Sequence, residues 1–236
     1  MKNNNKFRLD VWGAITLGTI ALYALFLLYP MAYMIRQSVL DPDTGGFTLA
    51  YFTKFFSKSY YFDTLINSFK VSITATVLSI AIGTPLAYLF TIFKIKGKSV
   101  LNILIVVASM SAPFIGAYSW ILLLGRSGVI TAFFKNLGIA IPDIYGFGGI
   151  VLVMTLQLFP LVFLYAKGAL KNIDNSLIEA AENLGCSGIA CFFKVVVPLI
   201  MPTLLAAALL VFMRSFADFG TPMLIGEGYR TFPVVL

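Results

Sequence analysis

The stretch KNIDNSLIEAAENLGCSGIACFFKVVVP, residues 171–198, lies between two long apolar runs and decides how this chain is interpreted. Its charged residues and glycines interrupt a sequence that is otherwise strongly apolar. A polar segment between two membrane-spanning helices has to lie in water, where a soluble partner can bind it. The segment therefore places the function of the chain at a membrane surface.

Composition gives the setting for that segment. Hydrophobic residues make up 59% of the chain and charged residues only 11%, whereas a typical soluble domain is about 45–50% apolar and about 25% charged. The mean hydropathy is +0.92. A water-soluble fold could not hide this much apolar surface.

Five runs without Asp, Glu, Lys or Arg are long enough to cross a membrane. A hydrocarbon core of roughly 30 Å takes about 20 helical residues. The runs are residues 11–35, 71–93, 99–125, 144–166 and 195–213. Because they are continuously apolar, they do not fit the alternating pattern of β-barrel strands. We predict an all-α membrane protein, a polytopic helical bundle with five transmembrane helices.

The basic residues predict the orientation. With the N-terminus in the cytoplasm, the inner segments 1–10, 94–98 and 167–194 contain nine Lys and Arg, a higher density than in the longer outer segments, as the positive-inside rule requires. The firmest anchor is the short loop Lys94-Ile95-Lys96-Gly97-Lys98. A basic collar at the membrane accounts for the net charge of +7, so no nucleic-acid partner is expected.

Residues 171–194 predict a helix, a tight turn and a second short helix. The first helix is expected near Ser176–Leu184, capped by Asp174, Asn175 or Ser176, with Glu179 completing a capping box with Ser176. Gly185 begins the break because glycine accepts a positive φ at low cost. One face of the first helix carries Leu177, Ala180, Ala181 and Leu184.

Nothing in the chain suggests catalysis or a bound cofactor. There is no histidine and no Cys-x-x-Cys pair, so zinc and haem have no obvious ligands. A GxxxxGK[ST] phosphate loop is also absent from the sequence. We expect no catalytic residue, no metal site and no cofactor on this chain.

The spacing around residues 179–198 resembles the EAA loop of the permease subunits of type I ABC importers, which have the MetI-like fold. Glu179-Ala180-Ala181 is followed after three residues by Gly185, and after nine more by Val195, Val197 and Pro198. Valine stands where the family usually has isoleucine and leucine. The spacing is complete, and the loop precedes the last predicted span.

The resemblance implies a set of partners and a mechanism. Two ABC ATPase subunits would use ATP and Mg²⁺, a second permease subunit or half would complete the pathway, and an extracytoplasmic binding protein would deliver the substrate. Glu179 would pair with a basic ATPase residue, while Ala180 and Ala181 would permit close approach and Gly185 would let the loop turn. The implied location is the bacterial inner membrane, where lipid surrounds the chain.

The end of the chain narrows the resemblance to one branch of these permeases. Ser215-Phe216-Ala217-Asp218-Phe219-Gly220-Thr221-Pro222-Met223-Leu224-Ile225-Gly226, with Tyr229-Arg230-Thr231, is similar to the ferric-iron, thiamine and polyamine branch. Ferric iron is the nearest match, and polyamine, thiamine or phosphonate uptake are the alternatives.

Three polar residues near predicted spans are candidates for the substrate path. Gln157 is the most polar side chain of the fourth run, and interhelical hydrogen bonding explains it equally well. Arg214 and Asp218 stand four residues apart where the fifth run meets the outer face. They are expected to form an interfacial ion pair or, as the alternative, to line the path.

The predicted organisation is linear. Residues 1–10 form a cytoplasmic tail, 11–35 the first membrane helix, 36–65 an outer loop and 66–236 the permease domain, whose cytoplasmic coupling loop is 168–194. The family places another membrane helix after the outer Tyr-Arg-Thr stretch. The resemblance thus implies a domain incomplete at its C-terminus, from a single permease or from the first half of a fused one.

Two other classes of membrane protein are the alternatives. A secondary transporter or channel would more often carry ionisable residues inside its spans, and the five runs have none. A membrane-embedded enzyme needs nucleophiles, paired carboxylates or metal ligands near a span. Neither class explains the EAA loop.

Overall fold

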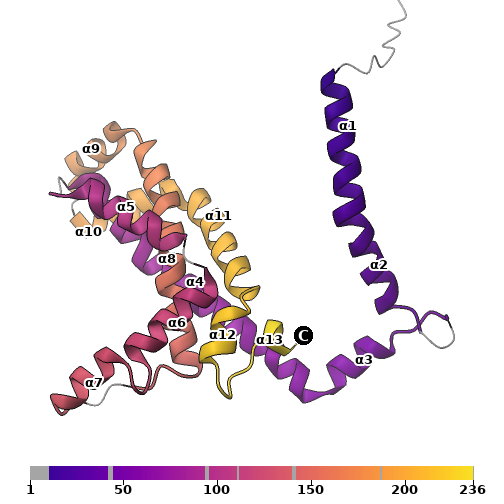
Figure 1. Cartoon of the computed structure of the whole chain (residues 1–236). Helices are drawn as coiled ribbons and strands as arrows, with labels where there is room; N and C mark the ends of the chain where they lie inside the picture. Colours follow the sequence, from indigo (N-terminus) through magenta and orange to yellow (C-terminus); the bar gives the residue numbers. More distant parts are fainter. Residues whose placement is uncertain are drawn as a thin grey trace, which may run out of the picture. The chain divides into compact units, whose positions relative to one another are not determined.

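The computed structural model describes residues 11–41, 45–93, 96–110, 112–139, 142–186 and 188–235. The chain divides into two compact units, residues 1–62 and 63–236, whose elements are labelled in Figure 1. The predicted cytoplasmic tail, residues 1–10, lies outside the described residues.

The first unit is dominated by one long helical segment. It comprises α1 (Val11–Tyr23), the π-helical turn η1 (Ala24–Leu28) and α2 (Tyr29–Ser38). Pro30 explains the π-helical turn, because it has no N–H to bond the carbonyl four residues earlier, which belongs to Phe26. The N–H of Tyr29 instead bonds the carbonyl of Ala24. The predicted span 11–35 is helical in the structure, and the candidate span continues to Ser38.

The region predicted as an outer loop contains structure of its own. An antiparallel bridge joins Leu40 and Phe47, and α3 (Ala50–Ser57) follows. No residue of α3 is buried. Helix α4 then begins at Ser59, well before the predicted start of the second span.

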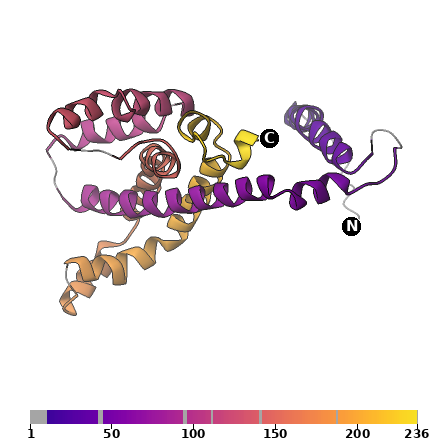
Figure 2. The ribbon, with the colours of Figure 1, turned by 90° about the horizontal axis from the view of Figure 1, so that it is seen from below.

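The second unit is a bundle of helices around α8. The elements in chain order are α4 (Ser59–Ile92), α5 (Lys98–Ser109), α6 (Pro113–Leu124), α7 (Val129–Asn136), α8 (Phe147–Lys171), α9 (Asn175–Asn183), α10 (Gly188–Cys191), the π-helical turn η2 (Phe192–Val196), α11 (Val197–Phe216), α12 (Gly220–Ile225) and α13 (Phe232–Val235). Figure 2 views the bundle nearly along α8, with α4 on one side and α5 and α6 on the other.

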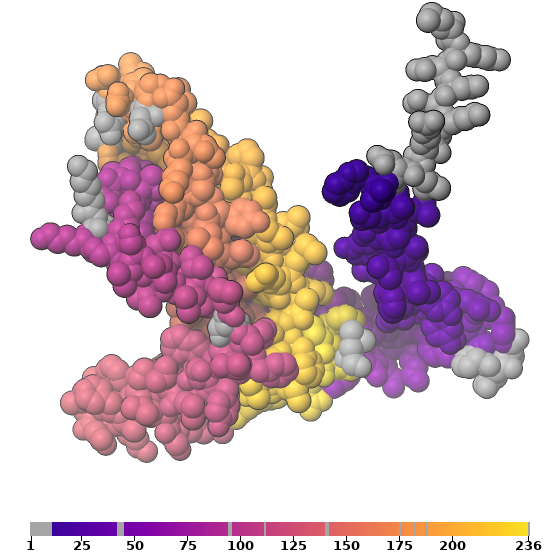
Figure 3. Space-filling view, turned by 45° about the horizontal axis from the view of Figure 1, so that its top comes forward, coloured from indigo at the N-terminus to yellow at the C-terminus, as the bar shows by residue number. Residues whose placement is uncertain are grey.

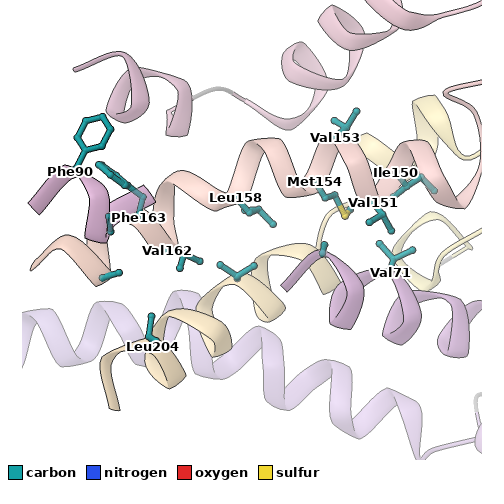
Figure 4. Close-up of a cluster of buried hydrophobic side chains, with 14 of the residues drawn as sticks. Val71, Phe90, Ile150, Val151, Val153, Met154, Leu158, Val162, Phe163 and Leu204 are labelled. Atoms are coloured by element: carbon teal, nitrogen blue, oxygen red, sulfur yellow. The ribbon is translucent and has the colours of Figure 1, made fainter. Parts of the chain in front are cut away.

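The core of this unit follows the length of α8. Ile150, Val153, Val162 and Phe163 are fully buried, because neighbouring helices cover most faces of α8. Figure 4 shows these side chains in a row, with Phe90 of α4 against Phe163. The two rings meet edge to face, 5.2 Å between centroids.

The predicted span 99–125 is wrong as a single helix. The structure breaks this run after Ser109 and begins α6 at Pro113. Ala112 is extended, with ψ 141°, because a residue before proline avoids the helical region. The break leaves α5 as a short apolar helix and makes Pro113–Asn136 the candidate span.

The predicted number of spans is confirmed. Five helical segments of the described chain are long and apolar enough to cross a membrane, namely Val11–Ser38, Ser59–Ile92, Pro113–Asn136, Phe147–Lys171 and Gly188–Phe216. Among the described residues the regular structure is entirely helical. The fold is therefore an all-α polytopic bundle, as predicted.

Candidate functional site

The segment with the EAA sequence forms a helical elbow, which we define as residues 174–191. Its first helix, α9, is capped by Asp174, whose Oδ1 accepts the backbone N–H of Ser176 at 3.0 Å. The predicted capping box between Ser176 and Glu179 is wrong, because α9 already starts at Asn175 and Ser176 lies inside its first turn. Glu179 is left with its carboxylate exposed.

The turn of the elbow needs its glycines. Gly185 has φ +85° and Gly188 has φ +55°, a region that other residues adopt only with strain. The predicted helix break at Gly185 is confirmed. Helix α10 then continues through η2 into α11, with Pro198 in the first turn of α11. The N–H of Val197 bonds the carbonyl of Phe192, five residues back. The reason is the same as at Pro30, because Pro198 has no N–H to bond the carbonyl four residues earlier.

The elbow exposes an apolar surface. Leu184 is 88% exposed, Ile189 77% and Leu177 49%, and Ala180 beside them is also exposed. Ile178, by contrast, packs against the buried core. This contact holds α9 to the bundle, while Leu177, Leu184 and Ile189 leave apolar surface of the elbow open to a partner.

A cavity of about 450 Å³ separates part of α9 from the ends of α4 and α8. Glu179 and Ile178 line it from α9, and Lys171 lines it from α8. Figure 3 shows the α8–α10 region in orange beside α5 in magenta. The elbow is thus set on the ends of the bundle helices.

A second cavity brings together the three candidate residues of the substrate path. Gln157, Arg214 and Asp218 line one space of about 480 Å³, between α8, α11 and the segment before α12. The rest of the lining is mostly apolar and comes from Ser109, Pro113, Phe114, Met154, Leu158, Ala217, Phe219 and Gly220. Their role as a substrate path stays a prediction.

The predicted ion pair between Arg214 and Asp218 is wrong. The ion pairs among the described residues do not include it. Asp218 instead caps α12, accepting the N–H of Gly220 at 2.9 Å through Oδ1 and the hydroxyl of Thr221 at 2.6 Å through Oδ2. A cap satisfies donors that a helix start otherwise leaves free, so the carboxylate binds the start of α12 and forms no ion pair with Arg214.

An exposed arginine joins three segments in a way that the sequence analysis missed. Arg126, between α6 and α7, contacts Asp143 through Nε at 3.0 Å and Glu227 through Nη2 at 2.9 Å. Its guanidinium also lies 4.7 Å from the ring centroid of Tyr145. The contacts join residues 17 and 101 positions apart, and no sequence spacing signals such pairs.

A second missed feature ties the end of the described chain to α4. The side-chain amide of Asn67 donates to the carbonyl of Arg230 at 3.1 Å. The hydroxyl of Ser68 accepts the N–H of Phe232 at 2.8 Å. These bonds hold residues 230–232 against α4 in the absence of regular pairing.

Known permeases resemble this chain along nearly its whole length. It is 29% identical over 218 residues to a "putative ferric transport system permease protein FbpB 1" of Haemophilus influenzae, covering 92% of this chain and 34% of that protein. It is 28% identical to the "spermidine/putrescine transport system permease protein PotB" of Haemophilus influenzae, covering 94% of this chain and 79% of that one. The chain spans about a third of the length of the FbpB protein.

Solved structures support the fold. The crystal structure of a bacterial ABC transporter involved in the import of the acidic polysaccharide alginate contains a chain with TM-score 0.72 and 16% identity, covering 94% of this chain and 79% of that one. The same transporter in complex with an alginate pentasaccharide-bound periplasmic protein gives a TM-score of 0.73. At this identity the likeness concerns the fold alone.

The family is shown by a match along most of the sequence. Residues 46–235 match the family described as the inner membrane component of binding-protein-dependent transport systems. This range includes the elbow, the second cavity and every helix of the second unit. The resemblance inferred from Glu179 to Pro198 is confirmed at the level of the family, and the chain belongs to the inner membrane components of binding-protein-dependent transport systems.

Proposed function

We propose that the chain is a membrane-spanning permease subunit of an ATP-driven importer. In this proposal separate ATPase subunits bind the elbow, and their conformational changes during ATP hydrolysis are transmitted through it. The observation that carries the proposal is the exposed apolar surface of the elbow, where Leu184 is 88% and Ile189 77% exposed. Glu179 is exposed as well and lines the cavity on the bundle side of α9. A surface of this kind suits a short helix that docks in a groove of a partner protein.

The elbow is connected to the membrane-spanning helices, so a displacement of the elbow is transmitted to them. Ile178 of α9 packs against the core, and the ring of Phe192 lies 4.7 Å from that of Tyr88 on α4. Because α10 runs through η2 into α11, a displaced elbow moves α11 with it. ATP-driven closure of the ATPase pair would rock these helices between inward-open and outward-open states.

The remaining partners follow from the same proposal. A second permease subunit, or the other half of a fused one, would face the cavity of Gln157 and complete the pathway. An extracytoplasmic binding protein would dock at the opposite end of the bundle from the elbow. The elbow and the N-terminus would both lie in the cytoplasm, which agrees with the basic residues at 94–98 and 167–194.

Ferric iron is the proposed cargo, and polyamine, thiamine or phosphonate are the alternatives. The cavity of Gln157, Arg214 and Asp218 supports this choice through its guanidinium. Both carboxylate oxygens of Asp218 already accept hydrogen bonds from α12, whereas the guanidinium of Arg214 has no ion pair among the described residues. A guanidinium that can bind an anionic group favours iron accompanied by anionic oxygen ligands over a polycation such as spermidine.

The coupling role is tested with the complete importer, co-expressed with its ATPase, second permease part and binding protein. The double variant Glu179→Lys/Gly185→Glu should abolish co-purification of the ATPase and uptake of the cargo, while membrane insertion stays intact. A stable complex between this variant and the ATPase would rule out the proposal. Uptake of radiolabelled ferric citrate and of spermidine by the unaltered importer separates the two leading cargoes.

A further inference from the structure

Three lysines converge on a cavity of about 340 Å³ at the elbow end of the second unit. Lys98 comes from the first turn of α5, and Lys167 and Lys171 come from the last turns of α8. No acidic residue lines the cavity, whose other lining residues are Phe90, Thr91, Ser99 and Asn102. Among the described residues, the ion pairs include none of the three lysines.

Lys167 is held in place within this cluster. Its ammonium donates to the side-chain oxygen of Asn102 and lies 5.3 Å from the ring centroid of Phe163 and 6.0 Å from that of Phe90. A carbonyl oxygen and two aromatic faces orient the ammonium but bring no negative charge to neutralise it. The cluster therefore keeps a concentrated positive charge.

The start of α5 adds to this positive end. Its N-cap is Gly97, at φ +77°, and no side chain caps the helix. The first-turn N–H groups of a helix carry partial positive charge and favour an anion. Ser99, beside Lys98 in the cavity lining, offers a hydroxyl donor as well.

The surface next to the cavity points to the source of the anion. Next to Lys98 and Ser99, α5 exposes apolar side chains, with Val100 61%, Ile103 60% and Leu104 58% exposed. A phosphate held by lysines at the end of an apolar, exposed helix face has the geometry of a lipid headgroup whose acyl chains follow that face. A soluble phosphate compound would leave the apolar face of α5 without a partner.

We propose that the cavity of Lys98, Lys167 and Lys171 is a binding site for the phosphate headgroup of an anionic phospholipid. Basic pockets between helices at the cytoplasmic membrane surface bind such headgroups. Lys171 also lines the neighbouring cavity that contains Glu179, so the bound lipid lies directly beside the elbow. The site does not depend on which cargo the chain transports.

The test uses the full chain, delipidated in a mild nonionic detergent, with phosphatidylglycerol and phosphatidylcholine of identical acyl chains as probes. Native mass spectrometry should show preferential retention of phosphatidylglycerol. Lys98→Gln/Lys171→Gln should weaken that binding about fivefold for each lysine removed. The control Lys54→Gln/Lys135→Gln removes two lysines elsewhere and should leave it unchanged.

Several results would overturn the site. Equal retention of the two lipids by the unaltered chain would refute the site. This comparison needs no variant, so it holds even if a variant fails to fold. Equal weakening by the control pair assigns the binding to net charge. Complete displacement of phosphatidylglycerol by excess inorganic phosphate identifies a soluble anion as the ligand. Restored binding in Lys98→Arg/Lys171→Arg supports the site.

Discussion

Gly83 of α4 lies against Phe159 of α8 so closely that a Cβ on Gly83 would stand 2.9 Å from the Phe159 carbonyl oxygen. The same Cβ would be 2.8 Å from the Cβ of Val162. Proline follows shortly after each contact point, Pro85 in α4 and Pro160 in α8. The two longest helices of the second unit thus cross at a point where only glycine fits.

We expect Gly83→Ala to destabilise the second unit, because the atoms that the new methyl group meets are backbone and Cβ atoms, which cannot swing away. The expected cost is about 1–3 kcal/mol, as for overpacking of a core. Thermal unfolding of the purified chain in detergent measures it. Gly168→Ala on α8 is the control, since nothing lies within 4 Å of its new Cβ. Equal losses from the two variants would mean that the crossing is not tightly packed.

The cap of α9 predicts a pH dependence of the elbow. The backbone N–H of Ser176, followed by its side-chain hydroxyl, lowers the pKa of Asp174 below the ordinary value of 3.8. Because the folded pKa is the lower one, the cap contributes fully above pH 3.8 and is lost as the pH falls below that value through the folded pKa. Asp174→Asn keeps an accepting oxygen but cannot titrate.

Hydrogen exchange of the α9 amides measures this effect. In the unaltered chain, protection relative to α7 should decrease below pH 3.8. In Asp174→Asn it should stay level over the same range, and in Asp174→Ala it should be low at every pH. A decrease in the Asn variant matching that of the unaltered chain would assign the pH dependence to another group.

The second cavity predicts different results for its two charged residues. Asp218→Asn keeps the Oδ1 acceptor for the Gly220 N–H and should preserve uptake by the complete importer, whereas Asp218→Ala frees the start of α12 and should reduce it. Arg214→Gln should also reduce uptake, but without changing the melting temperature, because Arg214 makes no ion pair within the described chain. If Asp218→Asn is as inactive as Asp218→Ala, the charge of Asp218 acts on the cargo and not through the cap.

The sequence predicted the helical class, the number of spans and the family, because apolar run length and a complete motif spacing are local signals. The helix end at Gly185 is predictable for the same reason, because a positive φ depends on the glycine itself and not on distant contacts. The break at Ser109–Pro113 was missed, although Pro113 marks it, because proline is tolerated inside many membrane helices and the run itself is continuously apolar.

At the candidate sites, the predictions that are wrong concern side chains with more than one available partner for an ion pair or a hydrogen bond. Arg214 and Asp218 have ion-pair spacing, but the N–H groups at the start of α12 take the carboxylate. At the elbow, Ser176 fits a capping box, but Asp174 starts the helix earlier. The cluster around Arg126 depends on residues that only the folded bundle brings together.

The most direct test of the coupling role compares two glycines with the same backbone strain. Gly185 in the elbow has φ +85° and Gly138 after α7 has φ +76°, and neither would meet an atom within 4 Å through a new Cβ. Alanine at either position therefore costs a similar ~1–2 kcal/mol of local strain. The measurement is the amount of ATPase that co-purifies with each variant of the complete importer. We predict that Gly185→Ala loses most of the ATPase while Gly138→Ala keeps it, and equal retention by both variants would contradict the assignment of the elbow as the coupling element.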